Sequence, residues 1–397
     1  MKKIAIVTNG TLPIPAVKGG AVETLLNSFI DENENTNDFD LTVFSIADEN
    51  ISPLKNTYRN THFIYIKTPL LYKIKRAIRY FINKIHANAI PNQFLSEVLK
   101  YKTELRSADF ILIENNPSFA PFMHKIVKNP IVLYLHNDYL NVKNQKSAIN
   151  ILAHISHVIG VSDYIEKRVK EIAPPNCKVC HVHNGINLSK FDTAGLSNAR
   201  SANRLKYGFK DDDLVIIYVG RIQESKGIKV LLDAINKIPE SYSVKLLVVG
   251  SSAFKDSRKT IFLREVEKLG NQIPNRVIFT GFIDYELLSE IYASADCAIF
   301  PSLAPEAFSL VSIEAQASGL PVIITNSGGM PETVSNESGI ILEIDNNLEK
   351  KLIETTQKLA LDKELRSTMA EAAKKNVQKF NDKVYYKTLS EKLKEIH

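Results

Sequence analysis

Residues 296–334, DCAIFPSLAPEAFSLVSIEAQASGLPVIITNSGGMPETV, constrain the fold more than any other stretch of the chain. A short apolar run, CAIF, leads into a polar turn that carries Glu306, and the apolar-periodic segment 308–317 predicts a helix. A second apolar run, VIIT, follows the helix. Strand, helix and strand in this order form a βαβ unit, which requires a parallel sheet. Because parallel sheets bind ligands at the carboxyl ends of their strands, we expect a binding site around Glu306.

Two carboxylates lie in this unit, Glu306 in the turn and Glu314 in the helix. Ser309 is placed to cap the helix, whose free N–H groups favour an anion such as a phosphate. We therefore expect a nucleotide diphosphate to bind the amides of Phe308, Ser309 and Leu310. Glu306 would then accept hydrogen bonds from the attached sugar, and Glu314 from a ribose. The alternative is two solvated glutamates, since most glutamates are exposed.

This stretch resembles the Glu, seven residues, Glu signature of the retaining nucleotide-sugar glycosyltransferases of family 4, which have the GT-B fold. The Pro301-Ser302 pair before it and GLPV after it match the family as well. The resemblance implies that Glu306 holds the donor sugar and Glu314 the ribose. Ser309 is a departure, because the family usually has glycine there, and it leaves the choice of donor open.

A second signature, VGRIQESKG, follows the apolar run 214–219. Lys226 lies in the first turn of the next expected helix, where a cation opposes the helix dipole. Arg221 and Lys226 can converge there if an anion lies between them. The pattern strongly resembles the family's diphosphate-binding signature, and the resemblance also places Ile283 beside the base of the donor. Without Glu306 downstream, both cations would be read as surface charges.

In the first half of the chain, Gly19 and Gly20 precede an apolar-periodic helix. A long loop separates them from the first strand, so they do not form the tight fingerprint of a nicotinamide oxidoreductase. They resemble the family's glycine-rich first loop, in which Gly20 lies against donor phosphates and acceptor. His136 ends the buried run 131–135 and should face the cleft, where a neutral imidazole could bind a hydroxyl or assist proton transfer. Simpler interpretations remain open: the two glycines could form an ordinary turn, and His136 could be a structural histidine.

At 397 residues the chain is expected to form two domains. We expect an acceptor-binding domain over 1–190 and a nucleotide-sugar domain over 191–380, with the polar segment 189–206 as their linker. The fold class is α/β, with two doubly wound, Rossmann-like parallel sheets facing a cleft, as in GT-B proteins. Residues 381–397 correspond to the family's terminal helix, which crosses back to the first domain. Beyond Thr333 we expect helices only.

Charge is concentrated in the first half of the chain. Residues 1–190 hold 23 Lys and Arg against 16 Asp and Glu, and the rest hold 27 against 28. The segment 70–90 is a basic amphipathic helix pattern that fits an anionic membrane surface and fits equally a core-packed helix with a solvated face. No signal peptide, membrane span or nucleic-acid motif is evident. We expect a cytoplasmic protein, with peripheral contact with the inner face of the membrane as an open alternative.

The resulting hypothesis is a retaining hexosyltransferase-type glycosyltransferase. It would move a sugar from a nucleotide diphosphate, a UDP-sugar, to a glycan or lipid-linked acceptor in capsule or other cell-surface polysaccharide assembly. Arg221 and Lys226 would stabilise the leaving diphosphate in place of a metal, so no cofactor is expected. Two alternatives share these features: a nucleotide-sugar epimerase of GT-B fold, and a non-catalytic partner of another glycosyltransferase.

Overall fold

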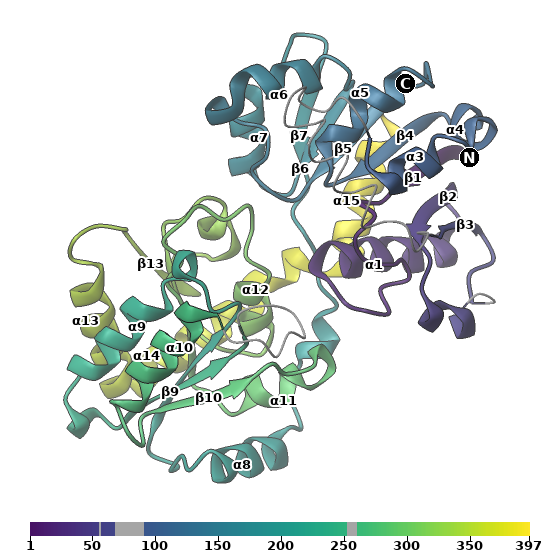
Figure 1. Cartoon of the computed structure of the whole chain (residues 1–397). Helices are drawn as coiled ribbons and strands as arrows, with labels where there is room; N and C mark the ends of the chain where they lie inside the picture. The colour runs from purple at the N-terminus through teal and green to yellow at the C-terminus, as the bar shows by residue number, and fades with distance from the viewer. Residues whose placement is uncertain (55–56, 68–90, 252–259) are drawn as a thin grey trace. The chain divides into compact units, whose positions relative to one another are not determined.

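The chain forms two compact units. The computed structural model describes residues 1–54, 57–67, 91–251 and 260–397 (Figure 1). One unit comprises Met1–Gly185 together with Asp382–His397, and the other comprises Ile186–Asn381. We call them the first and second units. Residues 186–190, expected in the first domain, lie in the second unit.

The first unit contains a seven-stranded parallel sheet in the order β3-β2-β1-β4-β5-β6-β7. Its central strands are short apolar runs buried on both faces, as parallel sheets covered by helices require. The strands are β1 (Lys2–Val7), β2 (Phe39–Ile46), β3 (Thr61–Ile66), β4 (Phe110–Glu114), β5 (Ile131–Leu135), β6 (His157–Gly160) and β7 (Lys178–His181). The predicted parallel arrangement is confirmed.

The second unit contains a six-stranded parallel sheet in the order β10-β9-β8-β11-β12-β13. Its strands are β8 (Leu214–Val219), β9 (Val244–Val249), β10 (Val277–Gly281), β11 (Cys297–Phe300), β12 (Val322–Thr325) and β13 (Gly339–Leu342). The expectation of helices only beyond Thr333 is wrong, because β13 pairs with β12. The run GIIL is short and lies at the sheet edge, with Ile341 38% exposed, so its apolar pattern is weak.

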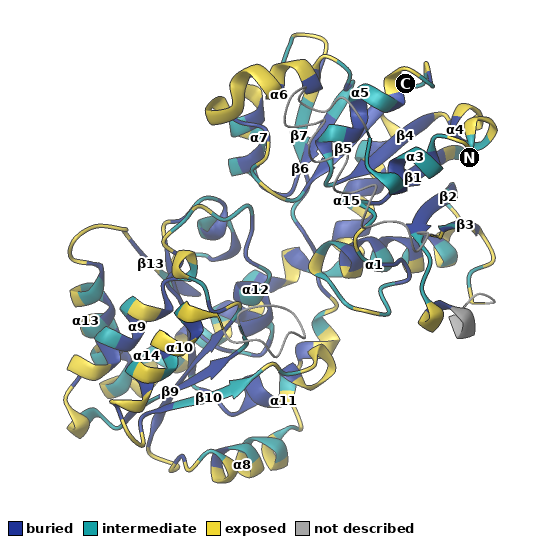
Figure 2. Cartoon of the chain, in the orientation of Figure 1, coloured by how far each residue is buried: buried dark blue, intermediate teal, exposed yellow. Residues whose placement is uncertain are grey.

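Helices cover both sheets, and Figure 2 shows most strands in the buried colour and the outer helix faces in the exposed one. The first unit has α1 (Ala21–Thr36), α3 (Gln93–Val98), α4 (Lys102–Ser107), α5 (Ala120–His124), α6 (Gln145–Leu152), α7 (Asp163–Lys170) and α15 (Asp382–Lys394). The second has α8 (Ser197–Lys206), α9 (Ile228–Lys237), α10 (Ile261–Asn271), α11 (Leu288–Ala293), α12 (Leu310–Ala317), α13 (Leu348–Leu361) and α14 (Lys363–Asn376).

The polar segment expected to be a linker contains a packed helix instead. Helix α8 packs on α11 within the second unit. The Arg200 guanidinium donates to Asp296 at 2.6 Å, and Arg204, buried to 4% exposure, donates to the other oxygen of Asp296 at 3.2 Å. The polar composition suggested a loop because α8 lacks the apolar face by which most helices pack. It is held to its unit by arginine–aspartate pairs instead.

Helix α15, at the yellow end of the colour scale in Figure 1, packs against α1 of the first unit. The Tyr386 hydroxyl donates to Asp38 at 3.0 Å and to Asn33 at 3.3 Å, and the Lys394 ammonium donates to Asp38 at 2.6 Å. These contacts join the end of the chain to the beginning of the same sheet.

Two further sequence expectations concern membranes. The basic pattern over 70–90 lies wholly outside the described residues, so membrane contact through it stays a prediction. Among the residues that the structure does describe, no helix has the length and apolar character needed to span a bilayer.

Candidate functional site

The loop after β11 is held in place by backbone contacts on two sides. On one side, Gly329 N–H donates to the Glu306 carbonyl at 2.7 Å, and the Thr325 hydroxyl donates to the Ser302 carbonyl at 2.6 Å. On the other side, Leu303 N–H donates to the Ser225 carbonyl at 2.8 Å. The loop therefore connects the carboxyl ends of β8, β11 and β12, where parallel sheets form their sites.

Two glycines make this close approach possible. Gly227 and Gly328 both have left-handed backbone, with φ of 70° and 61°. A Cβ on Gly227 would overlap the Pro301 carbonyl oxygen, and a Cβ on Gly328 would overlap the Glu306 backbone. Glycine is thus required at both positions for conformation and for space.

The structure brings together two predicted site residues, Lys226 and Glu306. The Lys226 ammonium lies 2.8 Å from Glu306 Oε2, with side chains 25% and 16% exposed. The Ser302 hydroxyl donates to the other carboxylate oxygen. The partly buried cation and carboxylate neutralise each other. Both side chains remain partly exposed, so that a ligand could contact either of them.

Arg221 is exposed at the end of β8, and its turn is fixed by a tyrosine. The Tyr218 hydroxyl donates to the Arg221 carbonyl at 3.0 Å. Burial, with the nearby Glu306 carboxylate adding to it, raises the pKa of Tyr218, whereas the Arg221 cation acts in the opposite direction. Tyr218 therefore lies close enough to interact electrostatically with Arg221 and Glu306, which are both predicted to bind the nucleotide-sugar, and its hydroxyl stays protonated.

The N-terminus of α12 differs from the expected capping arrangement. Ser309 occupies the N-cap position, but its side chain makes no capping hydrogen bond, so the expected cap is wrong. Its hydroxyl is buried, at 1% residue exposure, and has no hydrogen-bond partner among the described residues. Phe308 packs edge-on against Phe380 at 5.7 Å between ring centroids, and Leu310 opens the helix. A buried hydroxyl without a described partner at the N-terminus of a helix is suited to an anionic ligand.

Glu314 is far more buried than a solvated glutamate. Its residue exposure is 5%, and the Tyr292 hydroxyl donates to its Oε2 at 3.2 Å. Burial raises the pKa of Glu314 to about 7, and the Tyr292 hydrogen bond offsets only part of that shift. Among the described residues no donor reaches its other oxygen, which leaves an acceptor for a ligand hydroxyl.

The loop after β10 carries Ile283, which is half-buried. Its neighbours Phe282, Tyr285 and Leu287 are 36%, 36% and 49% exposed. Exposed aromatic and aliphatic side chains at the carboxyl end of a parallel strand form a surface on which a planar base could lie.

In the first unit, His136 is paired rather than alone. Its Nε2 lies 3.1 Å from Glu114 Oε2, and the two side chains are only 5% and 3% exposed. Its ring also packs on Tyr134 at 4.3 Å between centroids. Its backbone does follow β5, but the imidazole is held by a buried carboxylate, which was not foreseen.

Gly19 and Gly20 lie immediately before α1, as expected, and both have left-handed φ, at 72° and 105°. A Cβ on Gly20 would overlap the carboxylate of Glu23, which is buried and accepts from the Asn9 amide at 3.1 Å. The glycine therefore makes room for a buried carboxylate in the first turn of α1.

Sequence reasoning missed Glu114, Tyr218 and Tyr292. Each ends or follows an apolar segment and looks like an ordinary core position in one dimension. Only Glu114 gave a signal, since a carboxylate at the carboxyl end of a buried parallel strand lies at the edge of the sheet where ligands bind.

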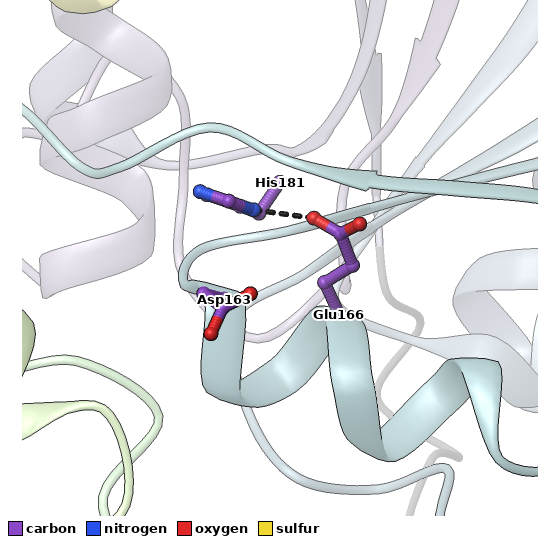
Figure 3. A group of neighbouring side chains, drawn as sticks. All are labelled: Asp163, Glu166 and His181. Atoms are coloured by element: carbon purple, nitrogen blue, oxygen red, sulfur yellow. Dashed lines mark hydrogen bonds and ion pairs between the residues drawn. The ribbon is translucent and has the colours of Figure 1, made fainter.

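A separate cluster in the first unit could hold a metal ion by composition. Asp163 and Glu166 on α7 and His181 on β7 place potential ligand atoms within 4.8 Å of one another (Figure 3). However, Lys167 pairs with Asp163 at 2.5 Å, and Lys170 and His181 both bind Glu166. Burial opposes it, but these hydrogen bonds lower the pKa of Glu166. The lysines already supply the positive charge that a cation would bring.

The Gly328 contact generates a stability prediction. Gly328→Ala should lower the free energy of unfolding by more than Gly208→Ala, because both need left-handed backbone but only Gly328 has no room for a Cβ. Backbone strain alone costs about 1–2 kcal/mol for alanine at such a site. Urea unfolding followed by circular dichroism measures both variants. Equal losses would show that the Glu306 loop does not depend on close approach to Gly328.

Comparison with known proteins agrees with this geometry. Residues 199–376 match the family described as glycosyl transferases group 1. The putative glycosyltransferase YtcC of Bacillus subtilis is 26% identical over 384 residues, covering 95% of this chain and 88% of that protein.

Solved structures show the same fold. Anabaena Alr3699/HepE in complex with UDP-glucose superposes with a TM-score of 0.75 at 20% identity, over 99% of this chain and 100% of that one. WaaG, a glycosyltransferase involved in lipopolysaccharide biosynthesis, superposes with a TM-score of 0.65 at 17% identity, over 99% and 100%. The solved structures thus show two Rossmann-like units of the GT-B fold, and residues 199–376 are similar to the glycosyl transferases group 1 family.

Proposed function

We propose that this chain is a retaining glycosyltransferase of family 4 that moves a sugar from a UDP-sugar to an acceptor hydroxyl. The observation that carries the proposal is the Lys226–Glu306 pair, 2.8 Å apart, in the loop that precedes α12. A nucleotide-diphosphate sugar has phosphates for the cation and hydroxyls for the carboxylate. It would replace one internal ion pair by two charge-assisted contacts.

The anion would extend from Lys226 to the N-terminus of α12. Its phosphate oxygens would accept from the backbone amides of Phe308, Ser309 and Leu310 and from the unpaired Ser309 hydroxyl. Arg221, at the exposed end of β8, would add a planar fork that grips two phosphate oxygens. A role for Gly20 at the donor phosphates stays a prediction from the resemblance.

The nucleoside would use the more buried part of the site. The free oxygen of Glu314 would accept from ribose hydroxyls, and the base would lie against Ile283. UDP is the nucleotide best supported, because the similar HepE structure contains UDP-glucose.

The reaction would break the bond between the anomeric carbon and the β-phosphate oxygen and form a bond from that carbon to the acceptor oxygen. The acceptor proton would pass to the departing phosphate, and the sugar would keep its configuration. Lys226 and Arg221 would stabilise the charge on the leaving diphosphate, which is the largest catalytic term available without a metal. His136, oriented by Glu114, and Gly19 would shape the acceptor side.

A glycan or lipid-linked glycan acceptor in cell-surface polysaccharide assembly is the role we propose. The lipopolysaccharide function stated for WaaG supports it by analogy of fold. The basic first half of the sequence agrees with an acceptor held at an anionic membrane surface.

The direct test of the proposal uses Glu306→Gln, which keeps the size of the side chain and removes its charge. We expect transfer from UDP-sugars to fall by about a hundredfold or more while UDP still binds. The product anomer, read by NMR with the wild-type protein, should match the donor. Normal turnover by Glu306→Gln, or an inverted product, would refute the assignment, and isomerisation of the donor without acceptor would indicate an epimerase.

Replacement of a metal by side chains gives a second prediction. Lys226→Ala should lower the rate constant for transfer by about two to three orders of magnitude, because one cation that stabilises the leaving diphosphate is lost. Arg221→Lys should lose part of the rate, since an ammonium cannot reproduce the guanidinium fork. Wild-type transfer should survive EDTA, and Mg²⁺ should rescue neither variant. Loss of activity in EDTA with near-normal Lys226→Ala would contradict this arrangement.

The buried carboxylate predicts a pH dependence of nucleotide binding. Because the pKa of Glu314 is raised to about 7, its carboxyl group is mostly protonated below that pH in the protein without ligand. Because ribose hydroxyls donate to the ionised form, UDP affinity should rise as pH increases towards 7, at most about tenfold per unit, and level off above it. UDP affinity is measured by calorimetric titration at several pH values. Glu314→Gln should lack the part of the pH dependence that Glu314 causes and keep only the part caused by titration of the UDP phosphate. Identical pH profiles would exclude Glu314 from the ribose site.

A further inference from the structure

The first unit contains a hollow that the proposed donor site does not use. Its volume is about 530 Å³, and it is lined by the loops that follow β1, β4 and β5 and by α6. All three strands run in the same direction, so the hollow lies at the carboxyl edge of the sheet. This is the edge at which open α/β sheets bind ligands, and the volume is typical of a small-molecule site.

Among the residues that the structure describes, the lining of the hollow carries no charged side chain. Its polar groups are amides and hydroxyls, namely Asn9, Thr11, Asn115, Asn116, Asn144 and Ser147, together with Ser118 and Tyr139. A phosphate or carboxylate ligand needs cations or several oriented N–H groups to replace its hydration. An uncharged polyhydroxylated ligand needs only donors and acceptors of the kind present.

Two of these asparagines are oriented by the loop after β4. Asn115 has left-handed backbone, with φ of 50°, and its Oδ1 accepts from the His136 backbone N–H at 3.0 Å. The Oδ1 of Asn116 accepts from the Ser118 hydroxyl at 2.7 Å. The amide N–H₂ groups of both residues have no acceptor within the part of the chain that the structure describes. Each amide is thus held by its oxygen and keeps its donors for a ligand.

Two carboxylates beside these loops also disfavour an anion. Glu23 accepts from the Asn9 amide, and Glu114 lies directly before Asn115. The exposed Lys143 and Lys146 are neighbours of lining residues in the sequence but are not themselves part of the lining. Asp138 is paired with Arg168 at 3.2 Å, so that cation is already neutralised. Tyr139 is 48% exposed and offers an aromatic face to the C–H groups of a sugar ring.

We propose that this hollow is the acceptor subsite and that it selects an uncharged sugar unit against a phosphorylated or carboxylated one. The assignment as an acceptor subsite rests on the proposed function. The selectivity rests on the lining alone. For a lipid-linked acceptor, the subsite would hold an uncharged sugar, and the phosphates would lie outside it.

Binding of simple probes to the full chain tests the proposal without relying on turnover. Saturation-transfer NMR with methyl glucoside, methyl galactoside and methyl N-acetylglucosaminide should detect binding of at least one glycoside, and glucose 6-phosphate should bind at least about tenfold more weakly. UDP binding, measured in parallel, reports on the donor site of the second unit. Failure of UDP binding or transfer would count against the proposed function, whereas the glycoside result decides the subsite.

Three variants assign the binding to the hollow. Ser147→Phe fills it from an exposed position on α6 and should weaken glycoside binding by about tenfold or more while UDP binding is unchanged. Asn144→Lys introduces a cation and should improve glucose 6-phosphate binding by about tenfold. Asn150→Lys is the control, because Asn150 is exposed on α6, the helix that Asn144 precedes as its N-cap residue, but does not line the hollow.

The proposal is overturned if none of the three glycosides binds or if glucose 6-phosphate binds the wild-type protein as well as they do. It is also overturned if Asn144→Lys and Asn150→Lys have the same effect on glucose 6-phosphate, or if Ser147→Phe leaves glycoside binding intact. The last two results would place the observed binding elsewhere on the surface.

Discussion

The ion pair between Lys226 and Glu306 is the interaction around which the second unit's site is built. It joins two loops that follow different strands, and it forms only because the backbones of these loops nearly touch. Gly227 and Gly328 leave the space where side chains would separate them. Two charges in a partly buried site lose part of their favourable hydration free energy. Their mutual attraction offsets this loss as long as they remain paired. A diphosphate sugar is one ligand that could replace both halves of such a pair.

The two units differ in the chemistry that they present at the same edge of similar sheets. In the second unit, Lys226, Arg221 and the N-terminus of α12 concentrate positive charge and free N–H groups near a carboxylate. In the first unit, the polar groups that line the hollow after β1, β4 and β5 are, among the described residues, uncharged amides and hydroxyls. Similar parallel sheets can therefore support recognition of an anion in one unit and of neutral hydroxyls in the other, because recognition depends on the loops.

Each unit also contains a buried polar pair. Glu114 orients His136 in the first unit, and Tyr292 donates to Glu314 in the second. Burying a carboxylate is costly unless it is hydrogen-bonded, so such pairs persist where their orientation matters. The unpaired Ser309 hydroxyl shows the opposite condition, a buried donor that a ligand would satisfy.

The sequence alone determined the parallel sheets of both units, because each central strand is a continuous apolar run followed by a turn. It also brought Glu306 and Lys226 to attention through their spacing and resemblance. It failed for α8, whose arginines bind Asp296 across the unit, and for the edge strand β13, whose run is too short to distinguish. Only the tertiary structure decided that Lys226 pairs with Glu306, that Ser309 does not cap α12, and that Glu114 holds His136. The two pairings depend on distances between segments far apart in the chain, and the missing cap depends on the orientation of the Ser309 side chain. A one-dimensional pattern contains neither.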